Sequence, residues 1–135
     1  MNIAKLMIPK VCTTVLHENN TIRQGLEILT RCRFSAIPVL DAEGRYVGSV
    51  TEGDFLQHVL KTGKTNLKDQ EAYHIKDILR RDFCPALPIE ADFSVVVDAA
   101  LRQNFVPVVD ARNALCGIVT RRNLIAAIAN VEKSN

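Results

Sequence analysis

The sequence predicts a mixed α/β (α+β) protein made of two β-α-β-β-α repeats that pack about a pseudo-twofold axis. The main observation is an internal repeat: "PVLDAEGRYVGSVTEGD", which begins at Pro38, returns as "PVVDARNALCGIVTRRN" from Pro107, at a constant offset of 69 residues. The second observation is that short apolar runs alternate with segments whose apolar residues have helical spacing. The third is size, because 135 residues with 47% hydrophobic amino acids suffice for one compact protein or for two small halves that share a core.

The first repeat covers residues 1–64. Its expected elements are a strand at 13–16, a helix within 19–33, strands at 36–40 and 45–50, and a helix at 51–61. Ile22, Leu26 and Leu29 have helical spacing. Thr21 and Gln24 have the form of a capping box, in which two side chains satisfy free amides at a helix start. Turn-forming residues at 41–44 join the two apolar strands, which predicts a β-hairpin.

The second repeat covers residues 75–135 and has the same order of elements. We expect a strand at 85–89, a helix at 92–103, strands at 105–109 and 114–119, and a helix at 120–130. Residues 65–74 form a polar, charged connector, and one short helix is expected near 75–80. Each half is too small to bury both faces of its sheet alone, so we expect the two halves to pack together.

The repeated pattern, in which Pro-Val, an Asp-x-x-Gly or Asp-x-x-Asn turn, a glycine in the next strand and Thr-x-x-Asp/Asn follow one another, resembles the cystathionine-β-synthase (CBS) domain. Two in tandem resemble a CBS pair, or Bateman module, of the stand-alone type found in Gram-positive bacteria. The resemblance implies a non-catalytic regulatory sensor that binds an adenosine nucleotide, such as AMP, ADP, ATP or cyclic di-AMP, in clefts between the halves. It also implies a disc-shaped homodimer, no required cofactor and a regulated partner protein. Because the resemblance spans nearly the whole chain, we expect no enzyme.

In CBS pairs one half holds the base, while the Thr-x-x-Asp stretch of the other half holds ribose and phosphate. The resemblance therefore places a nucleotide site at Val11, Thr13, Phe34, Ser35, Ala36 and Pro38, facing Thr120, Arg121, Arg122 and Asn123. A second cleft would set Asn104, Phe105 and Val106 against Thr51 and Asp54. Ser35 and Ala36 are small enough to leave space for a flat base. Phe105, which corresponds to Ala36, would partly fill the second cleft.

The Thr-x-x-Asp stretch also suits a nucleotide on physical grounds. Thr51 and Thr120 each stand where a strand ends and a helix begins, and free amides and the helix dipole favour an anion such as phosphate there. Asp54, one turn later, is able to accept two hydrogen bonds from the vicinal hydroxyls of a ribose. The alternative is that Thr51 and Asp54 form only a capping pair. Asn123 accepts without charge, so we expect weaker ribose recognition there and a greater role for phosphate contacts.

Two arginines stand beside the first of these sites. Neighbouring side chains on a helix diverge by about 100°, so Arg121 and Arg122 do not grip one phosphate together. One would contact the ligand, and the other would reach a second phosphate or the partner chain. The alternative is that both are solvated. Glu52, at the position of Arg121, would repel phosphate, so the two clefts should differ.

Composition argues against several other classes. The net charge is only +2, with no cluster of Lys and Arg for nucleic acid. No apolar run reaches the roughly 18 residues of a membrane span, and the start has no signal-peptide pattern, so we expect a cytoplasmic protein that binds no membrane. The four cysteines and three histidines lack metal-ligand or nucleophile spacing, so we expect no metal and reduced cysteines.

A homodimer is also predicted from the residues themselves. The helices at 54–61 and 122–130 carry more apolar residues than one buried face requires: Phe55, Leu56, Val59, Leu60, Leu124, Ile125 and Ile128. The alternative function is a ligand-free structural or interaction module whose clefts are degenerate, which Asn123 and Phe105 indicate.

Overall fold

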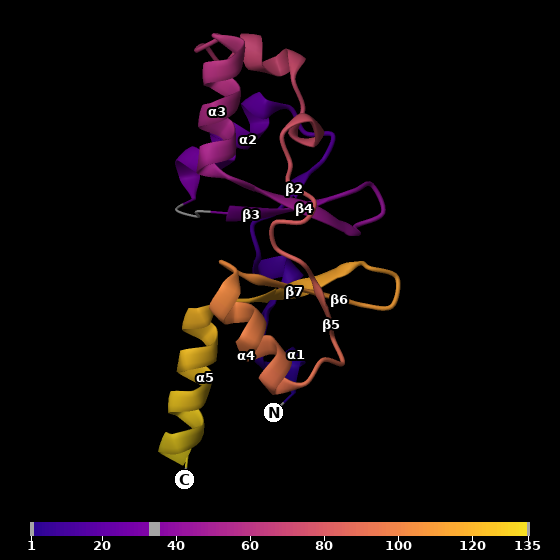
Figure 1. The fold of residues 1–135 in the computed structure, drawn as a ribbon, viewed down its shortest axis with the longest axis vertical. Helices are drawn as coiled ribbons and strands as arrows, with labels where there is room; N and C mark the ends of the chain where they lie inside the picture. Colours follow the sequence, from indigo (N-terminus) through magenta and orange to yellow (C-terminus); the bar gives the residue numbers. More distant parts are fainter. Residues whose placement is uncertain (1, 33–35, 135) are drawn as a thin grey trace. The chain divides into compact units, whose positions relative to one another are not determined.

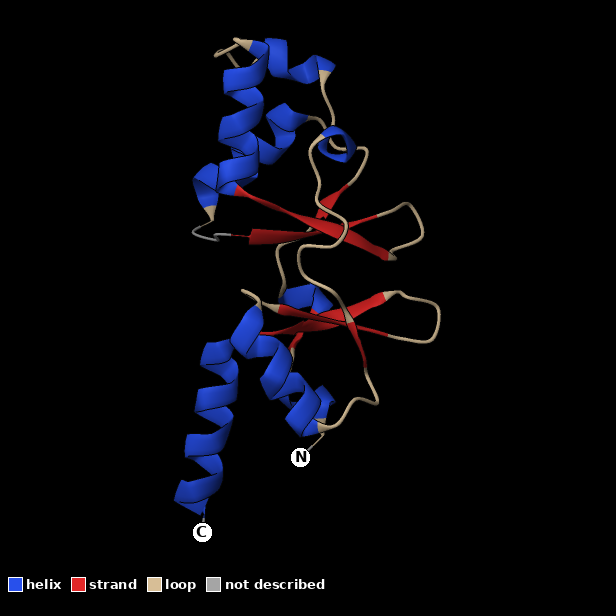
Figure 2. Ribbon diagram, in the orientation of Figure 1, coloured by secondary structure: helices blue, strands red, loops and turns tan. Residues whose placement is uncertain are grey.

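The computed structural model describes residues 2–32 and 36–134, which form two compact units (Figure 1). Unit 2 is continuous, from Thr14 to Phe83. Unit 1 combines the residues up to Thr13 with those from Cys84 onward. Each unit has its own sheet with helices packed on it (Figure 2), so the predicted mixed α/β fold with two repeats is confirmed.

Unit 2 contains a three-stranded sheet in the order β2-β3-β4. The short strand β2 (Leu16–His17) runs parallel to β3 (Ala36–Leu40), and β3 pairs antiparallel with β4 (Tyr46–Thr51). Helices α2 (Ile22–Arg31) and α3 (Glu52–Thr62) complete the predicted β-α-β-β-α order. Their shared core consists of Leu16, Ile22, Ile37, Val39, Val50, Phe55 and Ile75.

Unit 1 contains a four-stranded sheet in the order β1-β7-β6-β5. Strands β5 (Leu87–Pro88) and β6 (Val106–Val109) are parallel, and β6 and β7 (Leu115–Val119) form the predicted antiparallel hairpin. Helices α4 (Phe93–Arg102) and α5 (Arg121–Ser134) follow the predicted order. The core is built from Ile3, Leu6, Val96, Ala99, Ala100, Val106, Val108, Val119 and Leu124.

Capping explains where the helices of unit 2 begin and end. The predicted capping box is present at α2: the Thr21 hydroxyl accepts from the Gln24 amide, and the Gln24 side chain accepts from the Thr21 amide. Helix α3 ends at Gly63, whose φ of 69° is a left-handed conformation that glycine adopts without strain. No helix among residues 2–32 and 36–134 is both long enough and apolar enough to span a bilayer.

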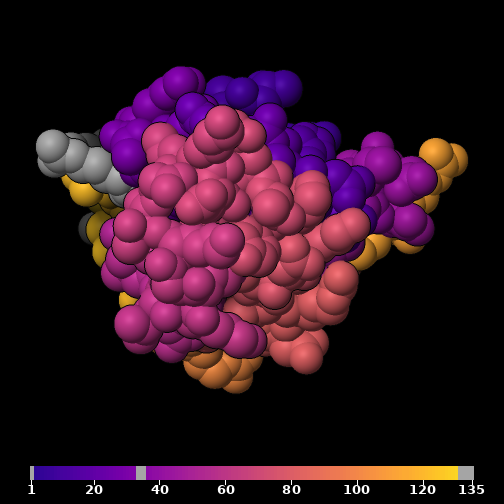
Figure 3. Space-filling view, turned by 90° about the horizontal axis from the view of Figure 1, so that it is seen from above, coloured from indigo at the N-terminus to yellow at the C-terminus, as the bar shows by residue number. Residues whose placement is uncertain are grey.

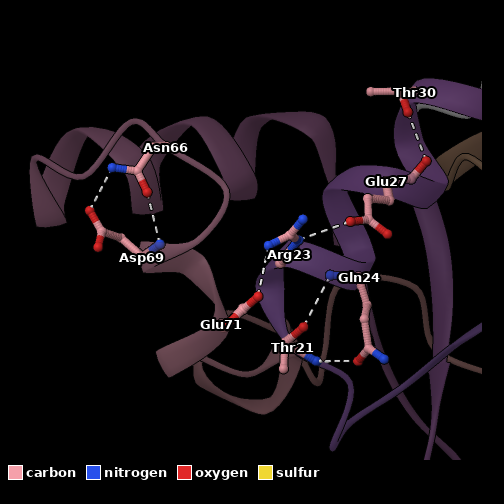
Figure 4. Close-up of polar contacts among 8 residues, drawn as sticks. All are labelled: Thr21, Arg23, Gln24, Glu27, Thr30, Asn66, Asp69 and Glu71. Carbon is pink, nitrogen blue, oxygen red and sulfur yellow. Dashed lines mark hydrogen bonds and ion pairs between the residues drawn. The ribbon is translucent and has the colours of Figure 1, made fainter.

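The predicted connector is an ordered part of unit 2. It contains the 3-10 turn η2 (Asp69–Ala72), which was not predicted, and it is followed by a second 3-10 turn, η3 (Ile75–Asp77), at the start of the short helix expected near 75–80. Ile75 is fully buried in the core. Arg23 of α2 joins Glu27 and Glu71 in ion pairs of 3.0 and 2.7 Å, which fastens η2 to α2 (Figure 4). The residues after α3 and α3 itself cover one face of unit 2 (Figure 3).

The first residues of each repeat, its opening segment, pack on the sheet of the other repeat. This exchange of opening segments was not predicted. Unit 1 takes α1 (Ile3–Leu6), β1 (Ile8–Pro9) and the 3-10 turn η1 (Lys10–Cys12) from the start of the first repeat, and β1 pairs antiparallel with β7 of the second. The corresponding opening of the second repeat, residues 75–83, lies in unit 2, where Arg80 forms an isolated antiparallel bridge with Ser49 of β4. Each unit is therefore built from both repeats.

The exchange explains one of the repeated glycines in each hairpin. A Cβ atom on Gly48 would lie 2.6 Å from the Arg80 carbonyl oxygen, and a Cβ on Gly117 would overlap the Ile8 carbonyl oxygen. These two neighbours correspond in the repeats, because "IAKLMI" from Ile3 aligns with "IKDILR" from Ile75. Glycine at 48 and 117 lets the opening segment approach the sheet.

Candidate functional site

The repeated aspartates of the hairpins have a structural role. Asp41 Oδ1 accepts hydrogen bonds of 2.9 Å from the backbone amides of Glu43 and Arg45. Asp110 Oδ1 accepts from the amides two and four residues later, at 2.8 and 3.0 Å. Each carboxylate therefore holds its β-turn closed. Within each turn the left-handed position is taken by Gly44 (φ 81°) in one repeat and by Asn113 (φ 65°) in the other, both residue types that tolerate it.

The Asp41 carboxylate is also paired with a cation. Burial favours its neutral form, but hydrogen bonds from the backbone and guanidinium of Arg45 and from the Glu43 amide outweigh this effect and lower the pKa of Asp41. The Arg45 Nε atom donates to Asp41 Oδ2 at 2.8 Å. Asp110 has no such partner in sequence, since Ala114 occupies the position of Arg45.

The first Thr-x-x-Asp stretch forms the capping box that was the alternative to a ligand role. The Thr51 hydroxyl accepts from the Asp54 amide at 3.2 Å, and Asp54 Oδ2 accepts from the Thr51 amide at 2.8 Å. The second carboxylate oxygen, Oδ1, accepts from Arg80 Nε at 2.9 Å. The Asp54 side chain is only 6% exposed, so both oxygens are engaged inside unit 2.

Arg80 was missed by the sequence analysis and is a central residue of this stretch. Its backbone exchanges two hydrogen bonds with Ser49, at 2.8 and 3.0 Å. Its guanidinium carbon lies 4.8 Å from the centre of the Phe83 ring, in cation–π geometry. Its side chain is nevertheless 48% exposed. The opening segment of the second repeat thus places the Arg80 guanidinium beside Asp54, at the start of α3.

The second stretch, in unit 1, is built differently. The Thr120 hydroxyl accepts from the Asn123 amide at 3.1 Å, and Asn123 Nδ2 donates to the Leu6 carbonyl oxygen at 3.4 Å. Ile8 corresponds to Arg80, so the position from which Arg80 pairs with Asp54 carries no cation in this unit. A backbone carbonyl requires a donor, which asparagine provides and aspartate does not. The exchanged segments therefore account for Asp at 54 and Asn at 123.

The two neighbouring arginines of α5 have separate environments, and that of Arg121 was not predicted. Arg121 donates from Nε to the Ala100 carbonyl and from Nη2 to the Leu101 carbonyl, so it covers the end of α4. Arg122 is exposed and has no hydrogen bond or ion pair with any residue that the structure describes. Of the two, Arg122 has donors available for a ligand.

The other predicted site residues are divided between the units. Unit 1 holds Val11, Thr13, Asn104, Phe105 and Val106 together with Thr120, Arg121, Arg122 and Asn123, while unit 2 holds Ala36, Pro38, Thr51 and Asp54. Val11 belongs to the turn η1, which packs against β7, and Thr13 directly follows this turn. Phe34 and Ser35 lie outside the described residues. That residues of different units face each other stays a prediction.

The environments of these residues differ widely. Val11 is 93% exposed, whereas Phe105, Val106, Ala36 and Pro38 are buried. The Thr13 hydroxyl donates to the Pro9 carbonyl at 2.9 Å. Val11 is therefore an apolar side chain that no other residue of unit 1 buries.

A pocket of about 180 Å³ lies in unit 2, lined by Asp54, Gln57, His58, Lys61, Asp77 and Ile78. This volume is below the roughly 300 Å³ at which ligand pockets begin, so it holds no whole nucleotide. His58 Nε2 lies 2.8 Å from Gln70 Oε1, and Gln70 Nε2 donates to the Lys64 carbonyl, so His58 Nε2 is the donor. His58 also packs edge-on against Tyr73, which confirms it as a packing residue. A larger pocket in unit 1, of about 520 Å³, is lined by residues 2–4 and 89–93 and includes no predicted site residue.

Other candidate groups are the Cys116 thiol and the possible metal ligands. Burial raises the pKa of the Cys116 thiol, and the negative charges of Asp110 and Glu90 raise it further. The thiol is thus held in its unreactive protonated form. Within residues 2–32 and 36–134, no three His, Cys, Asp or Glu side chains are grouped as a metal site requires.

Comparison with known proteins gives matches along the whole chain. The CBS domain family matches residues 3–61 and again residues 75–130. An uncharacterized protein of Methanocaldococcus jannaschii is 30% identical over 140 residues, which cover 97% of this chain and 32% of the relative. The chain spans about a third of the length of that relative.

Solved structures agree with the fold. Crystal structures of CbpB in complex with c-di-AMP (TM-score 0.90, 19% identity, covering 99% of this chain and 88% of the other) and of Listeria monocytogenes CbpB with c-di-AMP (TM-score 0.82, 26% identity, covering 98% of both chains) are similar. A structure of CBSX2 in complex with AMP has a TM-score of 0.75 at 22% identity and covers 97% of this chain and 98% of the other.

Proposed function

The chain belongs to the CBS-domain family, with two copies of the domain, and from this premise we propose that it is a regulatory nucleotide sensor without a reaction of its own. Its ligand would be an adenosine nucleotide: AMP, ADP, ATP or cyclic di-AMP. The observation that carries the proposal is the similarity to Listeria monocytogenes CbpB, which is solved with c-di-AMP and is 26% identical over 98% of both chains. In the cytoplasm, binding would change the surface that a partner protein contacts.

The phosphates would bind at the start of α5. The helix N-terminus at Thr120 favours an anion, and Arg122 is exposed with free donors. Asn123 adds no negative charge beside them. A ligand that is recognised mainly through its phosphates, such as a cyclic dinucleotide, suits this arrangement. At the start of α3, Asp54 would accept the hydroxyls of a ribose.

The decisive experiment is a calorimetric titration with AMP, ADP, ATP and cyclic di-AMP. We expect at least one to bind with a Kd of about 1 mM or lower. Because a charge-assisted hydrogen bond contributes about 1.5–3 kcal/mol, Arg122→Ala should weaken binding at least tenfold. Arg121→Ala is the matched control: it removes an equal charge from a side chain that bonds α4 and should change affinity less.

Two outcomes would contradict the proposed nucleotide site. If none of the four nucleotides binds or raises the melting temperature, the chain is the ligand-free interaction module, and native mass spectrometry would then show a dimer without a small molecule. Equal losses of affinity for Arg121→Ala and Arg122→Ala would place the phosphates elsewhere.

A homodimer is the second part of the proposal. Leu56 and Leu60 stand one turn apart on α3 and are 70% and 83% exposed, and Ile125 and Ile128 of α5 are 67% and 43% exposed. Leucine and isoleucine on two helices contribute stability only when another surface covers them. A second copy of the chain would provide that cover.

A further inference from the structure

Asp54 cannot receive a ligand as the structure stands. Its Oδ2 holds the Thr51 amide at 2.8 Å, its Oδ1 holds Arg80 Nε at 2.9 Å, and its side chain is only 6% exposed. A carboxylate has about four acceptor positions, but a buried one can use the remaining two only if a neighbour moves. A ribose hydroxyl must therefore displace one of the two present partners.

Of these partners, Arg80 is the one that can leave. The Thr51 amide is part of the backbone at the start of α3 and is fixed by the reciprocal bond from the Asp54 amide to the Thr51 hydroxyl. The Arg80 side chain is 48% exposed and rotates about several bonds. The Arg80 guanidinium can be hydrated when it leaves Asp54, whereas the buried carboxylate needs a new donor, and a ligand that offers two hydroxyl donors is able to replace it.

We propose that Arg80 is a latch on Asp54: the ribose hydroxyls of a bound nucleoside and the Arg80 guanidinium are alternative partners of the same carboxylate, so binding releases Arg80. This inference rests on the proposed function, because it takes Asp54 as the ribose acceptor. The latch belongs to unit 2 alone, since Ile8 and Asn123 stand at the corresponding positions of unit 1.

Release of Arg80 changes the surroundings of Phe83, which lies in the same unit. The Arg80 backbone stays anchored by its two hydrogen bonds to Ser49, so the side chain is the part that moves. That side chain covers the ring of Phe83, which is the last residue of unit 2 before the chain enters unit 1 at Cys84. Nucleoside binding thus removes the cation from a ring at the point where the units are joined.

Adenosine tests the latch without interference from phosphates. We would titrate wild type, Arg80→Ala and Arg81→Ala with adenosine and with 2′-deoxyadenosine by calorimetry. Arg80→Ala should bind adenosine at least about two-fold more tightly, because the ion pair that the ribose has to displace is absent. Arg81→Ala removes an exposed neighbouring charge and should match wild type. The gain should disappear with 2′-deoxyadenosine, which lacks one of the two hydroxyls.

Two further variants locate the effect and guard against misfolding. Asp54→Asn keeps an acceptor for the Thr51 amide but no charge for Arg80, so adding Arg80→Ala to it should produce no gain. Arg80→Gln retains a long polar side chain and should also bind adenosine more tightly than wild type, and circular dichroism would establish that each variant is folded.

The outcomes separate the latch from the proposed function. If wild type binds adenosine and Arg80→Ala binds it equally or more weakly, the latch is wrong while the nucleotide site stands. If only the Arg80 variants bind adenosine, the latch is supported in its strongest form. If no variant binds adenosine or any of the four nucleotides, the proposed function fails, and the latch fails with it.

Discussion

Asp54 of the first repeat corresponds to Asn123 of the second. The two residues differ because their hydrogen-bond partners differ. Asp54 pairs with the guanidinium of Arg80, and Asn123 donates to the Leu6 carbonyl. From the sequence, the change indicated only a weaker ribose acceptor. The partner could not be predicted, because it arrives from a segment 117 residues away in one case and 26 in the other.

Asn123→Asp should therefore have two measurable effects. A carboxylate cannot donate to the Leu6 carbonyl, so the free energy of unfolding in urea should fall by about 0.5–1.5 kcal/mol, the typical contribution of one hydrogen bond. If a ribose lies against this position, the added charge should strengthen binding of AMP, since bonds to a charged acceptor are stronger, and should weaken binding of cyclic di-AMP by repelling its phosphates. Equal calorimetric changes for both ligands would mean that residue 123 does not contact the ribose.

Asp41 makes the stability depend on acid pH. Its pKa is lowered in the folded protein, so its contribution is complete above the ordinary pKa of about 3.9 and is lost as the pH falls through that value towards the folded pKa. An asparagine side chain in its place would close the turn without titrating. The urea midpoint of wild type should therefore fall more steeply between about pH 5 and pH 3 than that of Asp41→Asn. Parallel profiles would show that the carboxylate contributes nothing specific.

At the level of elements, local patterns predicted most of the fold. Each helix and hairpin of the two β-α-β-β-α repeats is present, because helical spacing, the capping residues and the aspartates of the hairpin turns act over a few residues. The segments α1, β1, η1 and η2 were not predicted, since their structure depends on distant neighbours. The sequence does contain a signal for them: the short correspondence between the segments that begin at Ile3 and Ile75.

The glycines beside these segments give a test of the exchange. Gly48→Ala and Gly117→Ala should each destabilise the protein by about 1–3 kcal/mol, the range for overpacking, because the added methyl group meets a backbone carbonyl that cannot move aside freely. Gly53→Ala in α3 is the control. Its nearest neighbour would be the Thr51 hydroxyl at 3.6 Å, an ordinary contact, so it should be neutral or stabilise by about 0.5 kcal/mol.

These three variants would be compared by urea denaturation at one pH. If Gly48→Ala and Gly117→Ala unfold at the same midpoint as wild type, the opening segments do not approach the hairpins as closely as described. A large loss of stability for Gly53→Ala would instead indicate a general intolerance of side chains at these glycines.

For the whole molecule, the exposed apolar residues of α3 and α5 predict association. Ile128→Asp should convert a dimer to a monomer, because it would bury an unpaired charge in the interface. Light scattering at micromolar concentration measures this directly. Asn130→Asp introduces the same charge on another side of α5 and should leave the dimer intact. A wild-type monomer would rule the dimer out.

Because the opening segments are exchanged, neither repeat can be separated from the other without loss of structure. Neither repeat encodes a self-sufficient unit, because residues up to Thr13 complete the sheet of unit 1 and residues 75–83 complete the core of unit 2. A chain cut in the exposed loop near Lys64 should therefore yield two fragments that are incomplete apart and complement each other when mixed.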